Sequence, residues 1–253
     1  MLDVNRKQFE QTFPFDPTVP SDDIYHFDCP ICNAHNTLSF GNIKTYNTYP
    51  KDLTKEEEFD VDWLSVSFCE PLKCSACDGI TIMVGRGDVD RPYEVVPYDG
   101  RNVIEQCTPL YFYPPLKIIY IPLSYSSELV RDFEASFSLF WSDHKSCANK
   151  IRIAIERFLD YLDIGDPNDM INKRLLTIKS TRPEIYDPLT TIKFLGNEGS
   201  HRNDTFITNV DLLDAYEIIE PMLYEYSEEK KEKERKKQEA LKRLSSKYHE
   251  SKK

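Results

Sequence analysis

IKFLGNEGSHRND, residues 192–204, joins two segments that carry helical patterns of apolar residues. Five polar side chains surround its two glycines: Asn197, Glu198, His201, Arg202 and Asn203. Glycine is costly inside a helix and favourable where a helix ends, because it enters left-handed backbone conformations without a steric penalty. We therefore expect the chain to turn at these glycines and to hold Asn197 close to His201. The alternative is an ordinary interhelical turn, in which these two side chains only cap backbone groups.

The sequence around this stretch predicts a helical domain over residues 124–227. Apolar residues recur with helical spacing in 129–141 and again in 148–162. Ser142 or Asp143 can cap the second of these helices. The last long helix is expected to begin at a cap within 208–211, because Thr and Asp there suit that role.

Prolines predict where the shorter helices begin and where the last one bends. Asp166-Pro167 is expected to start one helix, and Asp187-Pro188 to restart another after an interruption at Arg182-Pro183. Pro221 should kink the last long helix. Residues 228–253 are rich in charge, and we expect a frayed or solvent-exposed helical tail there.

Two C-x-x-C motifs mark the N-terminal part, and together they supply Cys29, Cys32, Cys74 and Cys77. Each motif suits a tight knuckle, and two knuckles complete a closed, structural four-sulfur zinc site. We expect short strands to carry them in a β domain over residues 21–120, after an extended, proline-interrupted lead-in over 1–20. Cys69 is the main competing ligand, whereas Cys107 and Cys147 are expected to be small core residues. The alternative is a set of thiols without a metal.

Composition limits the classes of function. The chain has 253 residues and a formal net charge of −11. The tail, residues 228–253, carries a net +5, so the remainder carries −16. An acidic body argues against a broad nucleic-acid surface, and the tail is more typical of a solvated appendage than of a nucleic-acid arm.

No apolar stretch approaches the roughly 18 residues that span a bilayer, so we expect no membrane association. Without a signal peptide in residues 1–20, we expect a cytoplasmic protein, in which cysteines indicate metal binding before disulfides.

The second half resembles the bacterial domain of unknown function 4145 family, over roughly residues 118–227. The matching pieces are a proline-containing lead-in, the segment 152–156 and, most specifically, the segment 193–201. Family members often carry an N-terminal zinc ribbon, and the family is similar to the wider HEPN group of helical-bundle domains. The resemblance therefore implies an α+β chain, in which a zinc-ribbon-like β domain precedes an all-α, HEPN-like bundle.

The resemblance also implies roles for individual residues. Catalytic HEPN ribonucleases carry an Arg, a polar residue, three variable residues and a His, and their chemistry needs no metal. Asn197 matches the polar position and His201 matches the His, but Gly196 stands where the Arg should be. That substitution removes the bidentate phosphate contact. Arg202 or Lys193 could replace it, but both lie outside the motif. Together with Glu198 they are the candidates for binding contacts.

A second pair of residues belongs to the same candidate site. Arg152 and Glu156 lie one helical turn apart, in reach of each other. We expect them to approach Asn197 and His201 across the bundle in one polar cluster. The alternative for this cluster is an internal network that only fixes the turn.

Three functional classes follow from these observations. The preferred one is a non-catalytic binding or adaptor module of a bacterial or phage-related defence or nucleic-acid-processing system. The second is a metal-independent ribonuclease that uses His201 as acid or base. The third is a purely structural interaction protein. Since HEPN-type domains commonly self-associate, a homodimer is expected, with a protein partner from such a system and RNA or a nucleotide as further possible partners.

Overall fold

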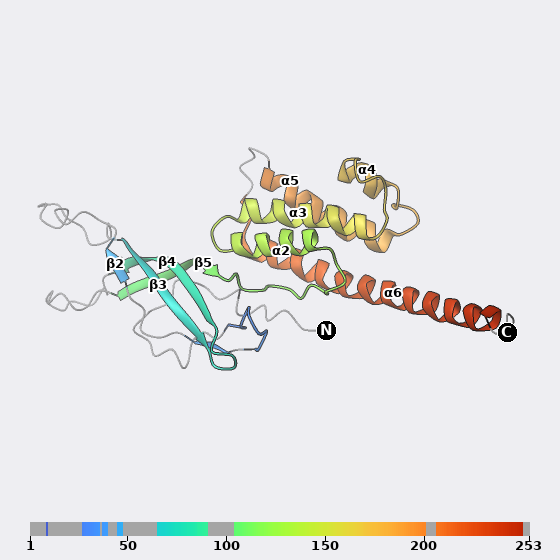
Figure 1. Cartoon of the computed structure of the whole chain (residues 1–253). Coiled ribbons are helices and arrows are strands. Elements are labelled where there is room, and N and C mark those ends of the chain that lie inside the picture. Colours follow the sequence, from blue (N-terminus) through green and yellow to red (C-terminus); the bar gives the residue numbers. More distant parts are fainter. Residues whose placement is uncertain are drawn as a thin grey trace, which may run out of the picture.

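The computed structural model describes residues 9, 27–35, 37–39, 45–47, 65–90, 104–200 and 206–249. Within these residues an antiparallel sheet is followed by a group of helices, which is the α+β class expected from the sequence (Figure 1). The described helices include none that is both long enough and apolar enough to cross a membrane.

Five strands form one antiparallel sheet. They are β1 (Leu38–Ser39), β2 (Thr45–Asn47), β3 (Ser65–Cys74), β4 (Ile80–Asp90) and β5 (Ile104–Tyr113). Strands β3, β4 and β5 follow one another as a meander, and β1 and β2 both pair with β3, at its opposite ends.

One face of the sheet is buried and the other faces outward. Along β3, buried and more exposed residues alternate, with Val66, Phe68 and Leu72 on the inner face. This alternation is what a strand with one covered face requires. Gly85 of β4 sits at a register irregularity, where a Cβ would lie 2.3 Å from Phe68 Cζ. Only glycine therefore lets the Phe68 ring lie across β4 at this point.

The helical part contains α2 (Ser127–Leu139), α3 (His144–Tyr161), α4 (Ile171–Leu176), α5 (Pro183–Ser200) and α6 (Asn209–His249). Helix α3 lies between α2 and α5, and α6 runs along the bundle and projects beyond it (Figure 1). The expected caps are present. Asp143 accepts a hydrogen bond from Ser146 N at 3.0 Å at the start of α3, and Thr208 and Asp211 bond each other's backbone N–H groups at the start of α6.

Several expected element boundaries were wrong. Helix α5 does not end at Gly196 but continues through it to Ser200. Pro183 is the first residue of α5, and Pro188 lies inside that helix instead of starting a new one. The helix expected from Asp166 begins only at Ile171. The Asp166 carboxylate instead accepts the backbone N–H of Asn168 at 2.9 Å, which closes a separate turn.

An aromatic cluster joins the sheet to the bundle. The ring centroid of Trp141, just after α2, lies 5.1 Å from that of Phe112 and 6.4 Å from that of Phe27. Phe9 and Phe140 complete the cluster, at 6.0 and 5.2 Å from Trp141. The sheet and the bundle therefore share one hydrophobic core.

The segment between β5 and α2 also packs on this core, because Ile118 and Ile119 are buried. Both residues fall within the range expected for the β domain, but here they form part of an irregular connection. Tyr125, near the end of the connection, donates from its hydroxyl to Leu223 O at 2.6 Å and so ties the connection to α6.

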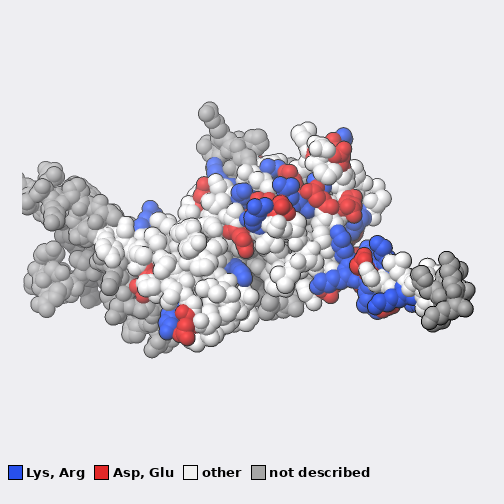
Figure 2. Space-filling view, viewed as in Figure 1, with Lys and Arg blue, Asp and Glu red and all other residues white. Residues whose placement is uncertain are grey.

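The charged residues beyond Ser227 continue α6 as an exposed helix. Lys and Arg side chains alternate with Glu along this projecting part (Figure 2). Ion pairs one turn apart, such as Arg235 Nη1 to Glu239 Oε1 at 2.6 Å, neutralise much of that charge. Each such pair adds a few tenths of a kcal/mol, about 0.2–0.5, to the stability of the projecting helix.

Candidate functional site

The four predicted cysteines meet at one point. Their Sγ atoms all lie within 4.8 Å of one another, and no disulfide joins them. The Cys29–Cys77 and Cys32–Cys74 pairs each have Sγ atoms 3.8 Å apart. A tetrahedron with Zn–S bonds of about 2.3 Å has edges of about 3.8 Å. The cluster can therefore hold a metal ion, and its spacing is compatible with zinc.

The two knuckles that present these thiols have the same backbone. Cys29 N donates to Ala34 O at 3.0 Å, and Cys74 N donates to Gly79 O at 2.9 Å. The residue after each second cysteine has a positive φ, 60° at Asn33 and 58° at Asp78. Asn and Asp tolerate this left-handed conformation better than most other residues with a side chain. A local sequence choice thus sets the direction of both thiol pairs.

Contacts between the knuckles fix them relative to each other. Strand β1 pairs Leu38 with Cys74, and Thr37 Oγ1 lies 3.1 Å from Cys74 Sγ. The hydrogen bond with Thr37 lowers the pKa of Cys74 to about 6, assisted by backbone N–H groups such as that of Ala76. The pKa of Cys77 moves the other way, to about 12, because a hydrogen bond from the Gly79 backbone N–H, which lowers it, is outweighed by contacts with the other thiols and by burial. Within the cluster, Cys74 is thus the thiol that ionises most readily, and the thiolate is the form that binds metal.

The other cysteines behave differently from the four. Cys69 lies on the exposed side of β3 and is not part of the cluster, so it does not compete as a ligand in this structure. Cys147 is buried and donates to Ser136 O at 3.2 Å, as expected for a core residue. The side chain of Cys107 lies outside the described residues.

The second candidate site, the polar cluster, centres on a close contact between α5 and α3. A Cβ built on Gly196 would lie 2.5 Å from Arg152 Cβ and 3.0 Å from Ala148 O. Gly196 therefore serves helix packing, not a turn, because no other residue allows the two backbones to approach this closely.

Arg152 and Glu156 form the expected pair. Arg152 Nη1 lies 2.6 Å from Glu156 Oε1, and Nε donates to Asn149 Oδ1 at 3.2 Å. Asn197 and Glu198 are partly buried on α5, in the two positions after the contact at Gly196. His201 and Arg202 lie outside the described residues, so the expected approach of His201 to this pair stays a prediction.

Lys193 has a position that the sequence did not indicate. Its side chain is buried, Nζ donates to Asn172 Oδ1 at 2.9 Å, and the same Nζ lies 4.0 Å from the centre of the Phe194 ring. Lys193 thus ties α5 to α4. A phosphate contact would require it to exchange these partners.

Sequence reasoning also missed Arg174, which is only 2 % exposed. Its guanidinium bonds Ile164 O at 3.0 Å and Glu156 O at 3.3 Å, and pairs with Asp160 at 2.8 Å. It thereby joins α4 to the Glu156 carbonyl inside α3 and to the Ile164 carbonyl just beyond the C-terminal end of α3. The nearest sequence signal is Gly165, whose φ of 66° and close approach to Arg174 suit glycine alone.

Comparison with known families divides the chain in the same way as the structure. The family described as Domain of unknown function (DUF4145) matches residues 134–247. The helical part matches DUF4145. A second family, Domain of unknown function (DUF8608), matches residues 18–113. Neither the curated proteins nor the solved structures contain a match to the chain.

The DUF4145 match agrees with the resemblance expected from the sequence and reaches further along α6 than residue 227, the end of that resemblance. Both Arg152 and Gly196 lie inside the DUF4145 part. The DUF8608 part contains both cysteine knuckles and all five strands of the sheet. The cysteine cluster and the α3–α5 contact therefore belong to different matched regions.

Proposed function

We propose that this chain is a non-catalytic binding or adaptor module of a defence or nucleic-acid-processing system. A zinc-ribbon-like β domain, held by a structural zinc ion, joins a HEPN-like helical bundle. A closed set of four thiolates leaves no coordination position for a substrate, so the ion stabilises the fold instead of performing chemistry.

The contact at Gly196 carries the non-catalytic part of the proposal. The HEPN resemblance places the phosphate-binding Arg of the ribonuclease motif at this position. In this fold even a methyl group there would meet Arg152 Cβ at 2.5 Å. An arginine at residue 196 is therefore incompatible with the packing of α5 on α3. The position that would carry the catalytic guanidinium is used for helix packing instead.

The runner-up is a metal-independent ribonuclease, and one observation favours it. The Arg152 side chain lies directly beside Gly196, so it could supply the missing cation from α3. However, Arg152 is already paired with Glu156 at 2.6 Å, and this carboxylate would repel a phosphate. The adaptor function accounts for this pair without requiring it to break.

Expression in bacteria separates the two functions. The wild-type chain and His201→Ala are produced at equal levels, and growth and total RNA integrity are measured. The adaptor function predicts identical, harmless behaviour of both proteins. Arrested growth with RNA cleavage that disappears in His201→Ala would establish the ribonuclease. If the wild-type protein cleaves RNA, loss of that cleavage in Arg152→Ala would further show that Arg152 supplies the cation.

We also propose that the helical part forms a homodimer, as HEPN-type domains commonly do. Light scattering at micromolar concentration tests this, and a strictly monomeric mass would contradict it.

A further inference from the structure

The outward face of the sheet carries exposed aromatic and aliphatic residues where polar ones are usual. Tyr111 and Tyr113 of β5 are 41 % and 65 % exposed. In the register of the sheet they pair with Val84 and Ile82 of β4, and Val84 is itself 38 % exposed. The solvated face of an antiparallel sheet is normally polar, so a contiguous apolar patch of this kind marks a binding surface.

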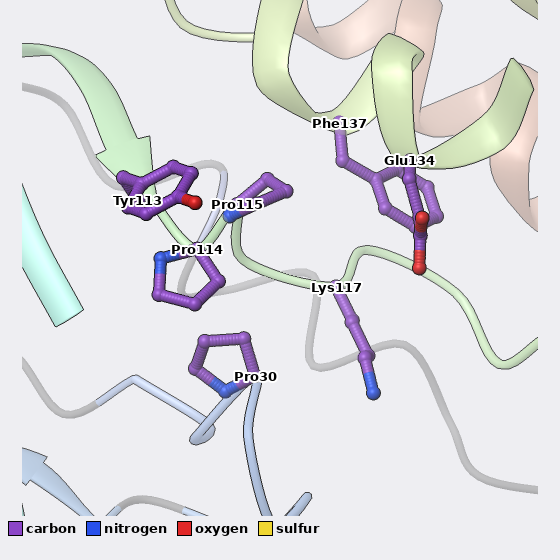
Figure 3. A pocket seen from close by; sticks show the side chains of 7 residues that line it. All are labelled: Pro30, Tyr113, Pro114, Pro115, Lys117, Glu134 and Phe137. Carbon is purple, nitrogen blue, oxygen red and sulfur yellow. The ribbon is translucent and has the colours of Figure 1, made fainter. Parts of the chain in front are cut away.

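At Tyr113 this face leads into a cleft between the sheet and the bundle. The cleft has a volume of about 290 Å³ and is lined by Pro30, Tyr113, Pro114, Pro115, Lys117, Glu134 and Phe137. Figure 3 shows Tyr113, Pro114 and Pro30 on one side and Phe137 and Glu134 of α2 on the other. Pro30 belongs to the first cysteine knuckle, so the metal centre holds one wall in place.

Charged groups of both signs lie at this surface. Glu134 offers a carboxylate acceptor in the cleft, and Lys117 supplies an ammonium group, whose Nζ donates to Asn33 Oδ1 at 2.7 Å. At the other end of the face, exposed Arg86 pairs with Thr108 in the β-sheet register, beyond Tyr111 along the strand. Cations therefore stand at both ends of the row of tyrosines, with an acceptor between flat apolar walls.

We propose that this face and cleft bind single-stranded nucleic acid. One unpaired base enters the cleft against Tyr113, and Glu134 accepts a hydrogen bond from an amino or imino group of that base. The next base stacks on Tyr111, and Lys117 and Arg86 contact phosphates. Residues two apart on a strand are spaced by about 6.7 Å, which lets successive splayed bases stack on one sheet face.

This chemistry favours a single strand over other ligands. Stacking on aromatic rings tolerates any base and needs few cations, so it suits a chain whose body is acidic. A duplex hides its base faces and relies on many phosphate contacts, which this face does not offer. A proline-rich peptide can also dock on aromatic grooves, but it would leave the Glu134 and Lys117 charges without a role. The inference deepens the proposed adaptor function and rests on it.

Fluorescence anisotropy with labelled 12-nucleotide RNA and DNA single strands tests the proposal on the full-length, zinc-loaded protein. Tyr111→Ala and Tyr113→Ala should each weaken binding about fivefold or more. Tyr113→Phe should bind as the wild type does, because it keeps the ring. The matched control is Tyr120→Ala, which removes a 46 % exposed tyrosine from outside the face and keeps the backbone N–H that donates to Glu220.

Salt dependence provides a second measurement. Two phosphate contacts, at Lys117 and Arg86, predict a slope of about −1.4 for the logarithm of the affinity against the logarithm of salt concentration. The projecting end of α6 is the competing cationic surface, so Lys242→Ala/Arg243→Ala is tested in parallel and should leave the affinity unchanged.

The proposal would be overturned by no oligonucleotide binding at low salt, by binding that the tyrosine variants leave intact, or by binding lost only in the α6 variant. Capture of a proline-rich peptide in place of oligonucleotides would assign the cleft to a polypeptide and also overturn it. If the oligonucleotides remain uncut, each of these outcomes overturns only the single-strand proposal and leaves the adaptor function standing. Cleavage of the bound strand would instead contradict the adaptor function.

Discussion

Gly196 and Arg152 are in backbone-level contact, since a Cβ on Gly196 would lie 2.5 Å from Arg152 Cβ. The side chain that gives the polar cluster its positive charge is thus also the side chain that forbids any larger residue at 196. Segment 193–201, the most specific part of the resemblance, therefore serves the packing of α5 on α3 at Gly196.

This relationship predicts the sign of a stability change. Gly196→Ala should destabilise the protein by about 1–3 kcal/mol, because overpacking must push α5 away from α3. Urea denaturation followed by circular dichroism measures it. Without the contact, alanine would stabilise an interior helical position by about 0.5–1 kcal/mol through its higher helix propensity, so an increase in stability would refute the contact.

The metal centre predicts one zinc ion per chain. Cys29→Ser and Cys77→Ser should each reduce the bound zinc measured by elemental analysis and lower the melting temperature. Cys69→Ser, which changes an exposed thiol outside the cluster, is the matched control and should retain both. Equal stability of metal-loaded and chelator-treated wild-type protein would contradict a structural ion.

Arg174 predicts a large effect at a buried position that was not among the candidate site residues. Arg174→Met should cost about 2 kcal/mol or more, because it removes the side-chain donor of the Ile164 carbonyl and the ion-pair partner of Asp160. Arg157→Ala is the control, since Arg157 is half exposed and reaches Asp132 only at 3.8 Å. Equal urea midpoints for the two variants would show that the buried guanidinium contributes little.

The sequence identified the four-cysteine cluster because its determinants are local. The C-x-x-C spacing sets each pair of thiols, and Asn33 and Asp78 supply the left-handed residue that each knuckle needs. The same holds for the caps at Asp143 and Thr208, where a side chain bonds backbone only three residues away. Patterns that involve residues only a few positions apart can be recognised in the sequence without knowing the fold.

The features that the sequence did not reveal depend on distant partners. Glycine at 196 follows the local rule for a helix end, but the backbone of α3 gives it a different purpose. Asp166 precedes a proline and is a residue type that suits a helix cap, yet its carboxylate accepts a hydrogen bond in a turn with Asn168. The cleft at Tyr113 combines residues from a knuckle, a strand end and α2, so it cannot be predicted from the sequence of any one segment.

The cap of α3 predicts how stability depends on pH. The pKa of Asp143 is lowered first by its hydrogen bond from the Ser146 hydroxyl and next by the Ser146 backbone N–H. A carboxyl group whose pKa is lower in the folded state contributes stability that is fully present above the unfolded pKa of about 3.9. That contribution is lost as the pH falls through the lower, folded value. At pH 7, Asp143→Ala should therefore cost about 1 kcal/mol.

The difference between wild type and Asp143→Ala should shrink when urea denaturation is repeated between pH 4 and pH 3. Asp143→Asn keeps an oxygen acceptor for the Ser146 N–H but cannot ionise, so its advantage over Asp143→Ala should stay constant across the same range. All three proteins lose bound metal equally as the thiolates protonate, so the comparison isolates the cap. A wild-type advantage over Asp143→Ala that persists undiminished at pH 3 would show that the ionised carboxylate does not stabilise α3.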